Sequence, residues 1–199
     1  MWTNSCKGML GLGACLLGAK HVTGVDIDDD ALRICQGNIE AIIENVDDDL
    51  VPHFTYRLDL IQSDAFQFER MMKLRAKQIV QKRNGNPSEE SSEYRLFDTV
   101  LLNPPFGTRI KGADMMFLKV ASELTRNAVY SLHKTSTRDV SILLPTNSTA
   151  IQYVTQKAAK WGFEVKVVAE LNYDLEASYS FHKKKSQQIQ VDLIRLRRK

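Results

Sequence analysis

Short apolar runs alternate with amphipathic stretches along most of the chain, and this alternation is the strongest constraint on its fold. The apolar runs have the length of strands, and in the stretches between them apolar residues recur at helical spacing. Such an order is typical of a parallel sheet that helices cover on both faces. We therefore predict an α/β fold. Because 43% of the 199 residues are hydrophobic, the chain can build the core of a single domain, 1–199.

Apolar periodicity and turn residues together predict the extent of each element. We predict helices at 9–17, 29–44, 69–82, 114–130 and 150–161, with Gly162 as a helix stop, and strands at 22–27, 54–63, 97–102, 139–144, 164–172 and 188–196. The last two strands should form an antiparallel hairpin with a long connection. The polar stretch 70–95 contains the turn Asn84-Gly85-Asn86-Pro87, and we expect it to be a surface insertion whose helix is solvated.

Charge, cysteines and histidines narrow the class of protein. A net charge of +3 suits an acidic partner but does not require one. The three cysteines form no CxxC pair, so we expect a reducing, intracellular compartment and no disulfide scaffold. The four histidines are dispersed, and we predict no metal site. The run 9–19 imitates a signal peptide, but its small residues favour a helix packed closely on a sheet, and no other run is long enough to span a membrane.

The tetrapeptide Asn103-Pro104-Pro105-Phe106 directly follows the predicted strand 97–102. It is thus placed at the carboxyl end of a strand, where ligands bind in open α/β sheets. The Asn103 side-chain oxygen and the Pro104 carbonyl can accept hydrogen bonds from the amine of adenine, and the two prolines stiffen the loop. Phe106 can stack on an extruded base. We predict that these four residues are catalytic in an adenine-N6 methyltransferase; an ordinary Asn-Pro turn is the structural alternative.

Acidic residues after two other strands are candidates for binding the cofactor, S-adenosylmethionine. Asp26 ends a predicted strand and can accept hydrogen bonds from both ribose hydroxyls of a nucleoside. The neighbouring Asp28, Asp29 and Asp30 are expected to be helix-capping and surface acids. Asp64, with Ala65, is placed to hold the adenine amine of the cofactor, although a plain capping role for Asp64 is an equally simple interpretation.

Basic residues gather near the end of the chain. One group is His182-Lys183-Lys184-Lys185, and another comprises Arg195, Arg197, Arg198 and Lys199. The aromatic residues Tyr173, Tyr179 and Phe181 lie close by in the sequence. We predict that Lys183, Lys184 and Lys185 bind the RNA backbone. A solvated loop without a partner is the alternative.

Four segments together resemble the methyltransferase-like protein 5 family. These segments are Gly24-Val25-Asp26-Ile27-Asp28, Asn103-Pro104-Pro105-Phe106-Gly107-Thr108, Val129-Tyr130-Ser131-Leu132-His133-Lys134 and Phe181-His182-Lys183-Lys184-Lys185. The resemblance implies a Rossmann-like class I S-adenosylmethionine-dependent fold and methylation of an adenine in small-subunit (18S) ribosomal RNA. It also implies a heterodimer with a small zinc-binding methyltransferase activator subunit, in the nucleus, nucleolus and cytoplasm. It places Asp26, Asp64 and Ala65 at cofactor-contacting positions and Asn103 to Phe106 on the catalytic loop.

The chain departs from this family at its beginning. The family has a first strand ending in a glycine-rich loop that holds the methionine part of the cofactor, whereas of that loop this chain retains Gly8. We therefore expect the first strand to be missing and S-adenosylmethionine to bind weakly or not at all. A second insertion is expected at about 140–153. The alternatives are a shortened, catalytically impaired binding module and a protein-glutamine methyltransferase, a family that usually has Tyr where Phe106 stands.

Overall fold

The computed structural model describes residues 2–3, 8–47, 49, 51, 57–82, 97–105, 112–134, 150–176 and 186–199. The elements along the chain are β1 (Trp2–Thr3), α1 (Met9–Leu16), β2 (Val22–Asp26), α2 (Asp29–Ile43), β3 (Leu58–Gln62), α4 (Ala65–Lys82), β4 (Phe97–Leu102), α6 (Ala113–Leu124), β5 (Thr125–Lys134), α7 (Ala150–Lys160), β6 (Phe163–Glu176) and β7 (Ser186–Arg198).

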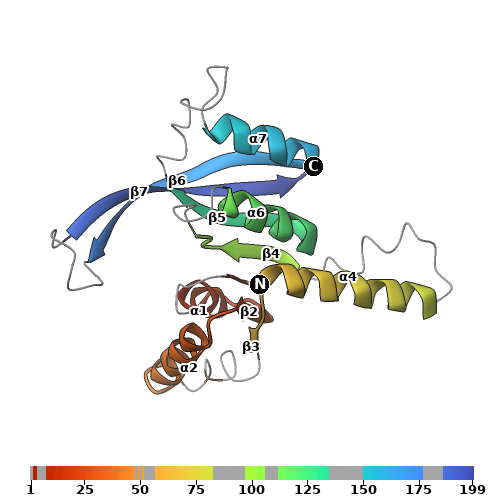
Figure 1. Cartoon of the computed structure of the whole chain (residues 1–199). Helices are drawn as coiled ribbons and strands as arrows, with labels where there is room; N and C mark the ends of the chain where they lie inside the picture. The colour runs from red at the N-terminus through yellow and green to blue at the C-terminus, as the bar shows by residue number, and fades with distance from the viewer. Residues whose placement is uncertain are drawn as a thin grey trace.

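The strands form one seven-stranded sheet in the order β3-β2-β1-β4-β5-β7-β6 (Figure 1). Strands β1 to β5 pair in parallel, and β7 lies antiparallel between β5 and β6. A helix follows each of β1 to β4, as parallel strands need because their connections must cross the sheet. The predicted α/β fold is confirmed.

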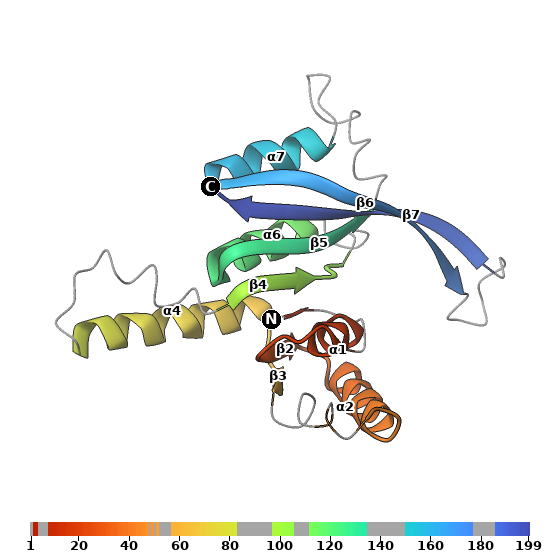
Figure 2. The same cartoon turned by 180° about the vertical axis from the view of Figure 1, so that it is seen from behind.

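Helices cover both faces of the sheet (Figures 1 and 2). On one face α1 and α2 pack with Val22 and Leu101. On the other face α4, α6 and α7 pack with Val100 and Leu102. Neighbouring residues of β4 thus face opposite clusters, as the two-residue period of a strand requires. Each fully buried Leu, Val or Phe in these clusters stabilises the fold by about 1.5–3 kcal/mol.

The central strand is present, which corrects the prediction that it is missing. β1 consists of Trp2 and Thr3 and lies between β2 and β4, with Trp2 opposite both Gly24 and Leu101. Two residues cannot produce a visible alternating pattern in a sequence. Pairing on both sides nevertheless holds them in the sheet, so the sheet is continuous from β3 to β6.

The predicted helix 114–130 is wrong in its second half. Helix α6 ends at Leu124, and Thr125 already begins β5 with extended backbone angles. The Thr125 hydroxyl lies 3.1 and 3.0 Å from the carbonyl oxygens of Asp98 and Ala128, which fixes the change of direction. Beyond it, Val129 and Ser131 are buried at the spacing of a strand. Pairing with β4 outweighs the helical spacing that the sequence also allows.

Helix α4 is longer and more buried than predicted. It begins at Ala65, and it buries Phe68, Ala76 and Val80. Its Lys73 contacts Glu69 and also Glu123 of α6. The interpretation of this segment as a solvated surface helix is therefore wrong for 70–82, whereas 83–95 lie outside the described residues. Whether 70–95 is an insertion stays a prediction.

The predicted antiparallel hairpin at the end of the chain is confirmed as β6 and β7. Gly162, at φ 83°, stops α7 as expected. Among the described residues, β5 and β7 pair as far as Lys134 and Val191, and beyond them β6 and β7 continue as a two-stranded ribbon that projects from the sheet (Figure 1). The strand expected at 139–144 lies outside the described residues. Of the second expected insertion, 150–153 belong to α7, a helix that buries Val154 and Ala158.

Candidate active site at the carboxyl edge of the sheet

The parallel strands bring most of the predicted site residues to one edge of the sheet. Asp26 is the last residue of β2, Asp64 follows β3 by two residues, and Asn103 comes directly after β4. Because parallel strands end on the same side, these three side chains and the start of α1 lie along one edge. The edge faces the helix amino-termini, where backbone N–H groups favour negative charge.

Asp26 shapes the turn between β2 and α2. Its Oδ1 accepts a hydrogen bond from the Asp28 backbone N–H at 3.0 Å, and its backbone carbonyl accepts one from Ser63 at 2.9 Å. The side chain is half-buried. A carboxylate fixed in this way has a defined orientation at the edge, which suits it for accepting hydrogen bonds from a ligand.

The three following aspartates have the structural roles that the sequence predicts. Asp28 caps α2, because its Oδ1 accepts the Asp30 N–H at 2.9 Å. Asp29 and Asp30 both form ion pairs with Arg33, at 2.9 and 2.7 Å. These aspartates begin the helix and lie on the surface.

Asp64 caps α4. Its Oδ1 accepts hydrogen bonds from Phe66 N at 2.8 Å and Gln67 N at 3.1 Å. Ala65 is buried at the first turn of the helix. The alternative interpretation of Asp64 as a capping residue is thus confirmed, while its contact with a cofactor stays a prediction.

Gly8 is a packing residue in this structure. It precedes α1 at φ 81°, a backbone conformation that residues other than glycine rarely adopt. A Cβ at this position would lie 2.0 Å from Sγ of Cys35 on α2. Burial raises the pKa of the Cys35 thiol to about 11, and the nearby Cys15 adds to the shift. Gly8 therefore allows α1 and α2 to approach closely, and its predicted contact with a cofactor is untested.

The predicted catalytic loop leaves the sheet from its interior. Leu102, the last residue of β4, is buried and lies opposite Ser131 of β5. Asn103 is then half-buried, Pro104 buried and Pro105 exposed, so the segment passes from the core to the surface within three residues. Phe106 lies outside the described residues. The printed pairing of β4 with β5 reaches Leu102 and Ser131, and His133 lies two residues further along β5.

His133 and Asp114 form a buried pair beside this loop, and sequence reasoning did not assign a role to either. The His133 Nδ1 lies 3.3 Å from Asp114 Oδ2, a distance short enough for an ion pair, although the contact lacks hydrogen-bond geometry. Their side chains are 6% and 11% exposed. Neither ring nitrogen of His133 has a hydrogen-bond partner among the described residues, and leaving such a group unsatisfied costs about 1–3 kcal/mol.

The electrostatics of Asp114 agree with this pairing. Burial alone would raise the pKa of Asp114, but the His133 ring and backbone N–H groups at the start of α6 lower it below its ordinary value. Asp192 of β7 lies opposite His133 in the sheet and is also buried. The alternation of Val129, Ser131 and His133 was the signal in the sequence that a histidine points into the core.

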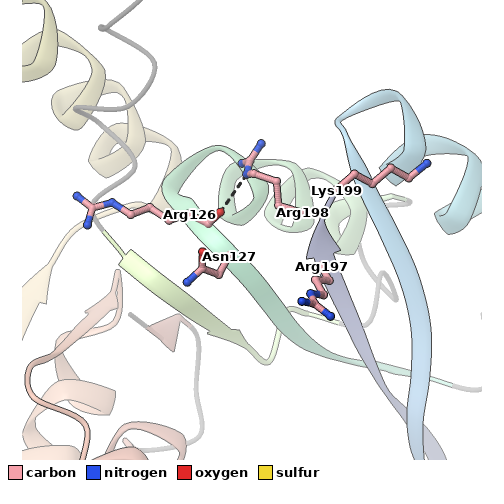
Figure 3. Close-up of a pocket in the computed structure, with 5 residues that line it drawn as sticks. All are labelled: Arg126, Asn127, Arg197, Arg198 and Lys199. Atoms are coloured by element: carbon pink, nitrogen blue, oxygen red, sulfur yellow. Dashed lines mark hydrogen bonds between the residues drawn. The ribbon is translucent and has the colours of Figure 1, made fainter.

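At the opposite end of β5 lies a hollow of about 460 Å³ lined by basic residues. Figure 3 shows the residues that line it, which are Arg126, Asn127, Arg197, Arg198 and Lys199. The Arg198 guanidinium is used internally, since Nη2 donates to the carbonyls of Ser122 and Thr125 at 2.9 and 3.0 Å. Arg126, Arg197 and Lys199 are exposed. The predicted Lys183, Lys184 and Lys185 lie outside the described residues.

The described part of the chain holds no cluster of three or more His, Cys, Asp or Glu side chains that could bind a metal ion. Within the same residues, none of the helices combines the length and apolar character needed to cross a bilayer.

The sheet order and the antiparallel β7 define the fold of the class I S-adenosylmethionine-dependent methyltransferases. The fold is similar to that of PH1948 of Pyrococcus horikoshii, with a TM-score of 0.64 and 24% identity over 99% of this chain and 72% of that chain. It is also similar to magnesium protoporphyrin IX methyltransferase of Synechocystis with bound S-adenosylhomocysteine, with a TM-score of 0.52 and 13% identity over 100% and 72% of the two chains. Residues 5–65 match the family described as ribosomal protein L11 methyltransferase (PrmA).

Curated relatives identify the family more narrowly. The chain is 40% identical to the rRNA N6-adenosine-methyltransferase METTL5 of Danio rerio over 94% of this chain and 70% of that protein. It is 39% identical to the Drosophila melanogaster protein of the same description, over 94% and 68% of the two chains. The chain belongs to the METTL5 family of rRNA N6-adenosine methyltransferases, a family that uses S-adenosylmethionine.

Proposed function

We propose that this chain transfers the methyl group of S-adenosylmethionine to N6 of an adenosine in small-subunit (18S) rRNA. The observation that carries this proposal is the position of Asn103-Pro104-Pro105 at the carboxyl end of β4, in a chain of this family. The neighbouring strand ends supply Asp26 and Asp64, so a nucleoside cofactor and a target base can share one edge of the sheet.

The loop residues orient the adenine amine. The amine lone pair is delocalised into the ring, and acceptors that bind its two hydrogens favour the rehybridised, nucleophilic form. The Asn103 side-chain oxygen and the Pro104 carbonyl are these acceptors, and burial of Pro104 keeps its backbone in place. Phe106 stacks on the base. When bound, S-adenosylmethionine supplies an electrophilic methyl group on its sulfonium. The amine proton leaves to solvent afterwards, so the chain needs no general base.

The cofactor is held by residues on the β2 and β3 side of the edge. Asp26 accepts hydrogen bonds from the ribose hydroxyls, and the end of its turn is already fixed by Asp28 N and Ser63 N. Asp64 and Ala65 contact the adenine, and Gly8 lies at the methionine end. Asp26 and Asp64 fit a nucleoside, because carboxylate oxygens accept hydrogen bonds from its hydroxyl and amine groups.

The RNA backbone is bound by Lys183, Lys184 and Lys185 and, at the other end of β5, by the hollow that Arg126, Arg197 and Lys199 line (Figure 3). β5 has 10 residues, so the two ends of the sheet are about 30 Å apart. An RNA that reaches both ends must extend over several nucleotides beyond the methylated adenosine.

The chain acts as a heterodimer with a small zinc-binding methyltransferase activator subunit, as its family resemblance implies. Its substrate places it in the nucleus, nucleolus and cytoplasm, where small-subunit rRNA is made and used. Co-expression with the activator followed by size-exclusion chromatography tests the heterodimer directly. Separate elution of the two chains would contradict it.

Methyl transfer into RNA tests the main proposal. With tritiated S-adenosylmethionine and the activator present, 18S rRNA fragments should acquire label that nucleoside mass spectrometry identifies as N6-methyladenosine. Asn103→Ala should lower kcat by about 100-fold, because it removes one acceptor from the transition state. Asn103→Asp keeps an acceptor oxygen and should retain more activity. Label in a release-factor protein and none in rRNA would show a protein-glutamine methyltransferase instead.

Cofactor affinity needs a separate measurement. We expect S-adenosylmethionine to bind only weakly, since the segment between β1 and α1, Asn4-Ser5-Cys6-Lys7-Gly8, has one glycine where the family has a glycine-rich loop. Isothermal titration calorimetry of the 199-residue chain with its activator decides this point. Micromolar binding would show that the loop composition does not limit affinity.

A further inference from the structure

The segment that carries the predicted catalytic residues lies between β4, which pairs with β5, and α6, which contacts a buried histidine of β5. It leaves the sheet after Leu102 and returns at α6, whose first turn contains Asp114. His133 contacts Asp114 at the returning end, with Nδ1 3.3 Å from Oδ2. At the departing end, β4 pairs with β5 as far as Leu102 and Ser131, and His133 lies two residues further along β5. The strand that pairs with β4 where the loop departs therefore also carries the histidine that contacts α6 where the loop returns.

The burial pattern shows that this contact is on the core face, away from solvent. Leu102, Ser131 and His133 are buried on the side of the sheet that α6 covers. On β7, Asp192 faces His133 from the other side and is 2% exposed. Among the described residues, the charged groups that these pairings place beside the ring are Asp114 from α6 and Asp192 from β7. Such a group is shielded from water, so its contacts are stronger than those of a surface pair.

A purely structural role does not account for a histidine here. The described residues provide no hydrogen-bond partner for either ring nitrogen, and burying unpaired nitrogens costs free energy. An apolar aromatic ring at this position would avoid that cost. The polar ring gains one specific contact, with Asp114, and Asp114 lies in the first turn of α6, where the loop rejoins the helix.

We propose that His133 is a positioning residue for methyl transfer, which holds the two ends of the segment from Asn103 to Gly112 in register through its contact with Asp114. The proposal rests on the proposed function for its effect on catalysis. His133 affects how Asn103 and Pro104 are placed relative to the adenine amine. The contact lies on the β4 and β5 side of the sheet edge. Cofactor binding on the β2 and β3 side therefore does not depend on His133.

Three variants and a matched control test this role in the 199-residue chain with its activator. His133→Phe keeps an aromatic ring and removes both nitrogens. His133→Asn keeps a nitrogen near the position of Nδ1, and Asp114→Asn removes the charge from the partner. The control is His21→Phe, because His21 forms a similar pair with Asp59, Nε2 to Oδ2 at 3.0 Å, but on the exposed surface of β2 and β3.

We expect His133→Phe to lower kcat about 10- to 100-fold, the effect of a small misplacement of reacting groups, while the Kd for S-adenosylhomocysteine stays within about twofold. His133→Asn should recover most of the loss. Adding His133→Phe to Asp114→Asn should cost little more, since both remove the same contact. An unchanged kcat in His133→Phe, or additive losses in the double variant, would overturn the proposal.

Hydrogen–deuterium exchange supplies a readout that needs no activity. His133→Phe should speed exchange in peptides that span 97–118 and leave those that span 22–43 unchanged, whereas His21→Phe should leave 97–118 unchanged. If His133→Phe proves too unstable to purify, hydrogen–deuterium exchange is measured on His133→Gln and Asp114→Asn instead. Unchanged exchange in 97–118 rejects the positioning role whatever the activity. Faster exchange in a chain that methylates no rRNA would retain the positioning role and reject the proposed function.

Discussion

Single side chains in this protein divide sharply between those that hold the fold and those available to a ligand. Arg198 belongs to the first group, since its guanidinium donates to the carbonyls of Ser122, Thr125 and Arg126 and lies 4.4 Å above the Phe163 ring. It thereby satisfies carbonyls at the end of α6, a position where arginine also interacts favourably with the helix dipole. Arg197, its neighbour, is exposed.

This division gives a prediction at the residue scale. Arg198→Leu should lower the free energy of unfolding by about 2–3 kcal/mol, because charge-assisted hydrogen bonds are lost and buried carbonyls lose their partner. Arg197→Leu should change it by less than about 0.5 kcal/mol, as surface substitutions usually do. Urea unfolding followed by circular dichroism measures both. Equal losses in the two variants would contradict the internal role of Arg198.

The same division explains which site residues the sequence could predict. Asn103-Pro104-Pro105-Phe106 and Asp26 are recognisable because each is defined by its position directly after a strand. Asp114 and His133 are not recognisable in this way. They belong to different elements, and their pairing depends on the packing of α6 on β5, which no local spacing reports.

At the scale of elements, the junction of α1 and α2 depends on a glycine. Gly8 has φ 81°, and a Cβ there would lie 2.0 Å from Sγ of the buried Cys35. Gly18 has nearly the same φ, 83°, but nothing lies within 4 Å of a Cβ there. A substitution at Gly18 therefore introduces backbone strain alone, whereas one at Gly8 introduces backbone strain and a steric clash.

Alanine at these two glycines should have different costs. Gly18→Ala should lower the free energy of unfolding by about 1–2 kcal/mol, the cost of a left-handed conformation in a residue with a side chain. Gly8→Ala should cost at least about 1 kcal/mol more, since α1 and α2 must also move apart. Thermal unfolding of both variants measures the difference. A Gly8→Ala variant as stable as Gly18→Ala would show that the two helices separate without cost.

A second element contact, between α4 and α6, is ionic. Lys73 of α4 contacts Glu69 and Glu123, and Lys119 lies 2.8 Å from Glu123. Burial alone would raise the pKa of Glu123, but hydrogen bonds from Glu69 and the two lysines lower it from 4.5 to about 2. Glu69 shifts in the other direction, since burial raises its pKa most strongly.

The lowered pKa of Glu123 predicts a loss of stability in acid. A carboxyl whose pKa is lower in the folded state contributes stability that is fully present above its unfolded pKa, here 4.5, and lost as the pH falls toward 2. Glu123→Gln should therefore lower the melting temperature at pH 7, and the gap to the wild type should narrow as the pH falls from about 4.5 to about 3. Glu69→Gln is the control, because a neutral amide can still donate to Glu123. A gap that stays constant with pH would contradict the assignment.

Across the whole molecule, the sequence predicted the layers better than their junctions. Strands 97–102 and 164–172 and helix 150–161 were predicted to within a few residues, because each carries an apolar pattern of its own, a short run, an alternation or a helical spacing. The central strand was not predicted, since Trp2 and Thr3 are held by pairing with β2 and β4 and not by any pattern of their own. The boundary of α6 and β5 failed for a similar reason, because it is fixed by contacts with β4.

The two ends of the sheet predict a salt dependence of RNA binding. Arg126, Arg197 and Lys199 line the hollow at the amino end of β5, about 30 Å from the proposed catalytic edge, so an RNA that contacts both ends releases counterions at both. Replacing Arg197 and Lys199 with alanine should weaken binding about equally for all RNA sequences and reduce the slope of log K against log salt by about 0.7 per lost contact on single-stranded RNA. It should leave kcat at saturating RNA unchanged, because these residues lie far from Asn103.

Arg33→Ala on α2 is the matched control, since Arg33 is exposed but paired with Asp29 and Asp30. Fluorescence anisotropy over a range of potassium chloride concentrations measures the slopes, and an unchanged slope in the double variant would show that RNA does not reach the amino end of the sheet.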